Sequence, residues 1–142
     1  MVTQKVRRTL LVVLLSHDSR TILLERQPGR SVWWPLRVDV PPHRSYARTA
    51  HRWQRRHGRR AGMRRGSVTG VLTVRTSTGC FEYRLIIIKL ARSEAAEVFS
   101  PSARWWPIAD VVAADLFPRE LGILMTGYVE GWIPDGSITL EA

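Results

Sequence analysis

Arginine side chains crowd the middle of the chain. Nine arginines lie between Arg44 and Arg65, no acidic residue occurs between Asp39 and Glu82, and the formal net charge is +10. Guanidinium groups bind phosphate and carboxylate oxygens through paired hydrogen bonds. This region is therefore suited to an anionic small molecule, an acidic protein surface or nucleic acid. A solvated basic face in a protein from a GC-rich bacterial genome is the competing interpretation, because Arg outnumbers Lys 20 to 2.

Two histidines and one carboxylate in the same region are candidates for moving protons. Histidine side chains serve as general acids and bases in enzymes, so His43 and His51 are candidates, and Asp39 is the best placed acid for a lone general base. A metal site is not indicated, because His51 and His57 are six residues apart and do not share one face of a helix. Cys80 has no obvious histidine partner, so covalent catalysis through a thiolate is not indicated either.

The spacing of this region resembles the Nudix box of the Nudix hydrolases, G-x5-E-x7-R-E-U-x-E-E-x-G-U, in which U is a bulky apolar residue. Aligned on Gly58, the first glycine of the box falls on Arg37 and its first glutamate on His43. Its Arg-Glu pair, its Glu-Glu pair and its closing apolar residue fall on His51, Arg52, Arg55, Arg56 and Arg59. Gly58 and the bulky Trp53 keep the residue types of the family.

In the family, those glutamates hold divalent metal ions against a diphosphate. Guanidinium and imidazole groups do not supply the oxygen ligands that hard dications need. We therefore expect no metal, no cofactor and no hydrolysis by the metal-dependent route of the family. The resemblance implies instead that Arg52, Arg55 and Arg56 face a cleft and contact the anion, together with Arg37 nearby. Trp34 is then a candidate for stacking on a flat part of the ligand.

Hydrophobic periodicity and turn residues predict the elements that position these side chains. Ser45 caps a helix that ends at about His57, with Gly58 as its stop. The run Leu85–Ile88 is apolar on both faces, which is typical of a central strand. Strands are predicted at 6–15, 21–25, 37–40, 67–75, 80–90, 104–108 and 137–140, and helices at 45–57, 109–114 and 118–128.

This order of elements also resembles the Nudix domain, with its opening hairpin, box helix and long second hairpin. The expected fold class is α/β, a Nudix-like α/β/α sandwich with a mixed β-sheet. The 142 residues predict one domain, with a core at about 5–132 and a tail at 133–142.

Composition indicates where in the cell the protein is expected. No apolar run approaches the ~18 residues that cross a bilayer, so no membrane association is expected. A single cysteine fits the reducing cytoplasm. The oligomeric state is open, and a homodimer is one possibility.

Three functions remain: a binding module for an anion, which we favour; a metal-free enzyme that acts on a small biosynthetic intermediate through His43, His51 or Asp39; and a basic nucleic-acid-binding module.

Overall fold

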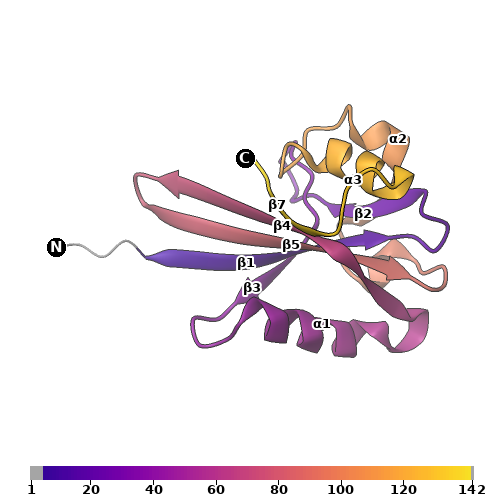
Figure 1. Ribbon diagram of the computed structural model, residues 1–142, viewed down its shortest axis with the longest axis horizontal. Helices are drawn as coiled ribbons and strands as arrows, with labels where there is room; N and C mark the ends of the chain where they lie inside the picture. Colours follow the sequence, from indigo (N-terminus) through magenta and orange to yellow (C-terminus); the bar gives the residue numbers. More distant parts are fainter. Residues whose placement is uncertain (1–4, 142) are drawn as a thin grey trace.

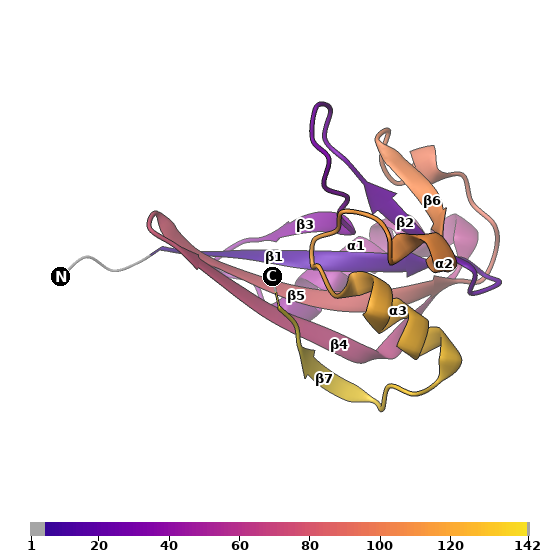
Figure 2. The same ribbon diagram turned by 90° about the horizontal axis from the view of Figure 1, so that it is seen from above.

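Seven strands form a mixed sheet with helices on both of its faces (Figure 1, Figure 2). The computed structural model describes residues 5–141, and for residues 59–61 it describes the backbone alone. The strands are β1 (Val6–Leu15), β2 (Thr21–Glu25), β3 (Leu36–Val40), β4 (Met63–Thr76), β5 (Gly79–Leu90), β6 (Ala103–Pro107) and β7 (Gly136–Thr139).

The strand order is β6-β2-β1-β5-β4-β7, and β3 pairs with β1 outside this series. β3 pairs with β1 from Arg8 to Val12, whereas β2 pairs with β1 at Leu15. The β1–β5 and β4–β7 pairs are parallel and the other pairs are antiparallel. The predicted α/β fold with a mixed sheet is confirmed.

Helix α1 (Tyr46–Ala61) covers one face of the sheet, and α2 (Ile108–Val111) and α3 (Leu121–Glu130) cover the other face (Figure 1). A short 3-10 helix, η1 (Ala96–Val98), precedes β6. In the described part of the chain, no helix is long and apolar enough to cross a membrane.

The core has one half on each side of the sheet, because side chains alternate along the central strand β1. Leu11 and Val13 belong to the half that contains Leu121 of α3. Leu10 belongs to the half that contains Ala50 of α1. Since both faces of β1 are buried, its sequence is a continuous apolar run and not an alternating one.

Several predicted boundaries were wrong. Helix α1 continues past Gly58 to Ala61 and ends at Gly62, whose φ of 64° is the left-handed conformation that glycine adopts without strain. Strand β4 begins at Met63 and not at residue 67, with a register shift between Arg65 and Thr69. The last helix begins at Leu121 and not at residue 118, and η1 lies in a segment predicted as a loop.

Candidate functional site

Helix α1 divides into a face that packs on the sheet and a basic face that is exposed. Its N-terminus is capped by the hydroxyl of Ser45, which accepts the backbone N–H of Arg48 at 3.1 Å. Tyr46, Ala50 and Trp53 lie in or against the core half on this side of the sheet. The exposed face of the helix includes Arg48, Arg52, Arg55 and Arg56.

A hollow of about 530 Å³ opens between α1 and β3, and we call it the arginine hollow. Thr49, Arg52 and Arg56 contribute to it from positions i, i+3 and i+7, which form one flank of α1. Its full lining is Val38, Arg44, Thr49, Arg52, Trp53, Arg55, Arg56 and His57.

The arginine hollow is lined by four guanidinium groups and by no carboxylate. Within residues 5–141, no side-chain hydrogen bond or ion pair engages Arg52, Arg55 or Arg56. His57 lies at the inner wall, with its ring centroid 4.7 Å from that of Trp53. Burial, and after it the charge of Arg56, lower the pKa of His57, so its imidazole adds no charge at neutral pH. The hollow is thus a concentration of positive charge without an internal counter-ion.

Arg8 fixes the turn that leads from β3 into α1. Its Nη2 donates to the backbone carbonyls of Pro41 and Arg44, at 2.6 Å in both cases. The same guanidinium lies 5.3 Å from the ring centroid of Tyr46, and that of Arg84 lies 4.9 Å from it. These contacts hold Arg44 at the rim of the arginine hollow.

A second hollow, of about 470 Å³, lies on the other side of β3, and we call it the aromatic hollow. Successive side chains of a strand point to opposite faces. Accordingly, Val38 lines the arginine hollow, whereas Arg37 and Asp39 line the aromatic hollow. The full lining of the aromatic hollow is Arg7, Thr9, Glu25, Gln27, Trp34, Arg37, Asp39, Phe81 and Tyr83.

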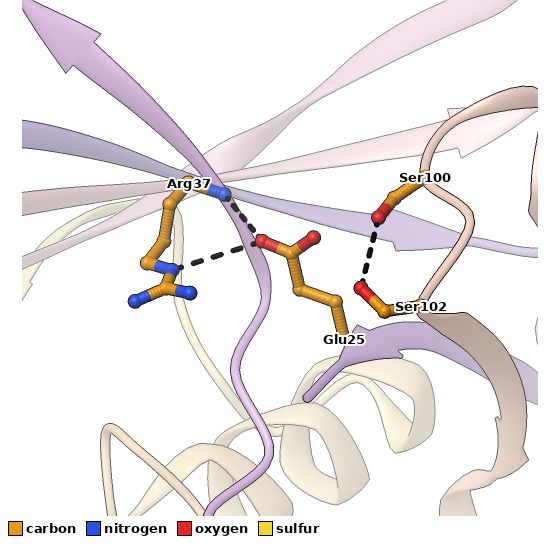
Figure 3. Close-up of polar contacts among 4 residues, drawn as sticks. All are labelled: Glu25, Arg37, Ser100 and Ser102. Atoms are coloured by element: carbon orange, nitrogen blue, oxygen red, sulfur yellow. Dashed lines mark hydrogen bonds and ion pairs between the residues drawn. The ribbon is translucent and has the colours of Figure 1, made fainter. Parts of the chain in front are cut away.

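Glu25 neutralises Arg37 inside the aromatic hollow (Figure 3). One carboxylate oxygen of Glu25 accepts the backbone N–H of Arg37 at 3.4 Å and lies 3.7 Å from its Nε. The guanidinium of Arg37 also lies 4.6 Å from the ring centroid of Trp34, whose ring packs against Phe117 at 4.2 Å. To one side of Glu25, the hydroxyls of Ser100 and Ser102 pair at 3.2 Å in the turn before β6 (Figure 3).

The backbone at residue 37 does not require the glycine of the box. Ser19 is the one non-glycine residue with positive φ among those described, so Arg37 has an ordinary strand conformation within β3. A side chain is therefore tolerated at this position, and it points into the aromatic hollow.

The structure separates the predicted ligand-binding residues into two groups. Arg52, Arg55 and Arg56 meet in the arginine hollow, whereas Arg37 and Trp34 lie in the aromatic hollow. The candidate acid–base residues are also separated. Asp39 is exposed at the aromatic hollow, and His43 and His51 are exposed and line neither hollow. Arg59, on which the closing apolar position of the box falls, lies outside the residues whose side chains the structure describes.

Sequence reasoning did not select Arg44, Thr49 or His57 as residues of the site. Thr49 could have been found because it precedes Arg52 by three residues and Arg56 by seven, and His57 because it follows Trp53 by four residues. Arg44 could not, because its position depends on the long-range bonds that Arg8 makes to the turn.

The residues present do not fit a divalent cation. Where the box has carboxylates, α1 presents Arg52, Arg55 and Arg56, whose charges repel a dication. Over the described part of the chain, no group of three or more His, Cys, Asp or Glu side chains gathers at one place. The arrangement is suited to hold an anion directly.

Solved structures of hydrolases share this fold. The chain is similar to the Ap4A hydrolase of C. elegans, with a TM-score of 0.67 and 14% identity over 91% of this chain and 100% of that one. It is also similar to the dihydroneopterin triphosphate pyrophosphohydrolase of E. coli, with a TM-score of 0.62 and 12% identity over 92% of this chain and 99% of that one. A Nudix hydrolase from M. smegmatis has a TM-score of 0.57 and 18% identity over 94% of this chain and 91% of that one.

No protein-family model matches the sequence, and no curated protein matches it. At these low identities, the structural similarity shows that the chain has the Nudix hydrolase fold.

Proposed function

We propose that this chain is a Nudix-fold protein with a degenerate box that binds an anionic small molecule in the arginine hollow without a bridging metal ion. One observation carries the proposal. Arg52, Arg55 and Arg56 replace the box glutamates, line a hollow of about 530 Å³ and have no internal counter-ion among the described residues.

The ligand class follows from the charge of the hollow. Four guanidinium groups suit a ligand with several negative charges, such as an oligophosphate or a polycarboxylate. A charge-assisted hydrogen bond to such a ligand contributes about 1.5–3 kcal/mol. Binding also relieves the repulsion among the arginines, which in a helix costs a few tenths of a kcal/mol for each like-charged i, i+4 pair.

A metal-free enzyme is the second candidate, and Asp39 carries it. This carboxylate is exposed at the aromatic hollow beside Tyr83 and Phe81, and no described side chain is paired with it. An anionic substrate bound in the aromatic hollow, which Arg7 also lines, would lie beside this general base. His43 and His51 remain candidates for the acid, although neither lines a hollow described above.

A thermal-shift screen with inorganic phosphate, pyrophosphate, tripolyphosphate, nucleotides and small polycarboxylic acids tests the proposed function. We expect at least one of these compounds to stabilise the protein in the presence of EDTA. Calorimetry with that compound should then show an affinity about a hundredfold weaker for the variant R55A/R56A, which corresponds to about 2.7 kcal/mol.

The matched control is R64A/R65A, which removes the same charge from two exposed arginines that line neither hollow. An equal loss in both variants, with a steep dependence on salt, would indicate nucleic acid or another extended polyanion instead. No stabilisation by any phosphate or carboxylate compound would contradict the proposal.

A further inference from the structure

The C-terminal segment of the chain and helix α1 differ in charge. Residues 105–141 contain six of the 12 acidic residues but only one of the 22 basic residues, Arg119. This segment includes α2 and α3, which lie on the face of the sheet opposite to α1 (Figure 1). We call this segment the acidic pole, because Arg119 is its only basic residue, whereas α1 carries basic residues and no acidic ones.

Large hydrophobic residues are also exposed on the acidic pole. Six large hydrophobic residues are exposed in residues 5–141, and four of them lie on this pole. They are Val112 (59% exposed), Ile123 (66%), Val129 (40%) and Trp132 (65%), and we call them the cap patch.

The geometry of α3 places acidic and apolar groups of this pole together. Ile123, Thr126 and Glu130 are at i, i+3 and i+7, which forms the outer row of the helix. The ring of Trp132 lies over Gly127 beside this row, 3.5 Å from the position that a Cβ there would take. An indole, an isoleucine and a carboxylate thus share one exposed face.

We propose that the cap patch binds the outer row of α1 in a second copy of this chain, formed by Arg48, His51 and Arg55. Charge complementarity selects this occupant, since α1 contains no acidic residue and the cap is acidic. Arginine over an aromatic ring is also a contact that the chain already makes internally, as between Arg26 and Trp33 at 4.6 Å.

The position of the two surfaces determines the type of assembly. Because the cap patch and α1 lie on opposite faces of the sheet, each copy offers both surfaces at once (Figure 1). Contacts between unlike surfaces are head-to-tail and produce open chains or rings, not a two-fold dimer. The net charge of +10 opposes encounter at long range, but at about 0.1 M salt charges beyond about 10 Å are screened and local complementarity dominates.

Two variants break opposite halves of the contact. A47E/R48E makes α1 acidic at its start, and it suits the fold because a glutamate at residue 48 completes a capping box with Ser45. I123Q/W132Q removes the cap patch at two exposed positions, where substitutions have small effects on stability. Neither variant changes a residue that lines the arginine hollow.

Sedimentation velocity of the full chain in about 0.1 M salt tests the contact, since a pair of charges is only partly screened there. We expect concentration-dependent association of the unmodified chain that is lost at about 0.5 M salt. Each variant alone should be monomeric, and their mixture should form a 1:1 complex through the one intact cap and the one intact α1.

Three results would overturn this assembly. In the first, the unmodified chain is monomeric at all concentrations. In the second, the unmodified chain associates but the mixture of the two variants stays monomeric. In the third, the chain is monomeric and its cap patch binds an arginine-rich peptide instead. The anion affinity of I123Q/W132Q, measured by calorimetry, separates this inference from the proposed function. Because Ile123 and Trp132 line neither hollow, the affinity should remain within about threefold of the unmodified value.

Discussion

The two hollows beside β3 differ in how their charges are balanced. In the aromatic hollow, Arg7 and Arg37 are matched by Glu25 and Asp39, and Glu25 forms an ion pair with Arg37 at 3.7 Å. In the arginine hollow, four guanidinium groups have no carboxylate among the lining residues. The strand between the hollows is shared, so the difference comes from the side chains and not from the backbone.

This comparison separates arginines that have a structural role from arginines that are available to a ligand. Arg37 occupies the position of the box glycine, but it is held by Glu25 and stacked on Trp34. Arg52 and Arg56, which fall on glutamates when the sequence is aligned with the resembled box, have no described partner. The number of arginines in the sequence does not distinguish these two roles. The positions of the acidic side chains in the structure distinguish them.

Converting the arginine hollow into its acidic counterpart should give the largest effect. The variant R52E/R55E/R56E restores the three helix glutamates of the resembled box. We expect it to lose anion binding by more than about a thousandfold, since attraction becomes repulsion. It should also gain Mn²⁺ binding, because carboxylates supply the oxygen ligands that were missing.

Calorimetry with Mn²⁺ and with tripolyphosphate measures both changes. The control, R52Q/R55Q/R56Q, removes the charges without adding oxygen anions, so it should lose the phosphate without gaining the metal. Mn²⁺ binding by the unmodified chain that equals that of the triple glutamate variant would contradict the comparison.

Removing the counter-ion of the aromatic hollow should have a smaller effect, on stability. Glu25→Gln removes the charge of a carboxylate that is only 16% exposed. It leaves the charge of Arg37, whose side chain is 30% exposed, without its partner. We expect unfolding to require about 1 kcal/mol less free energy in urea titrations. Asp39→Asn, in the same hollow but exposed and without a described partner, should change stability by less than about 0.5 kcal/mol. Equal effects of the two substitutions would show that the ion pair is not stabilising.

The smallest effect concerns the pH dependence contributed by His57. Its folded-state pKa is lowered, so below about pH 6.5 the unfolded chain binds the proton more readily than the folded chain does. Stability should therefore fall as the pH decreases from about 7 to 5, and His57→Phe should lose less over this window. Urea midpoints of both proteins at the two pH values measure the difference, and exposed His43→Gln serves as control. A bound anion should raise the pKa of His57 in NMR titrations.

The fold was predictable from the sequence because its signals are local. The apolar run of β1, the serine cap of α1 and the order of elements each depend on a few neighbouring residues. The end of α1 was misplaced because Gly58 precedes Gly62 in the sequence, and only the latter has a positive φ. The early start of β4 likewise depends on pairing with β5 across the sheet.

The site was predictable only in part. The helix spacing grouped Arg52, Arg55 and Arg56, and all three line one hollow, while their contact with a ligand stays a prediction. It did not show that Arg37 is paired with Glu25, because these residues meet through the bridge between Glu25, the last residue of β2, and Trp34, which precedes β3. The separation of the ligand-binding candidates into two hollows depends on which face of β3 each side chain occupies.

Calorimetric titration of tripolyphosphate into the unmodified chain, once with EDTA and once with excess Mg²⁺, tests the central claim most directly. If the arginine hollow holds the anion by itself, binding occurs in EDTA and is equal or weaker with Mg²⁺, because the metal ion neutralises part of the charge that the guanidinium groups recognise. Binding only with Mg²⁺, or hydrolysis of the phosphate that Mg²⁺ stimulates, would contradict the claim.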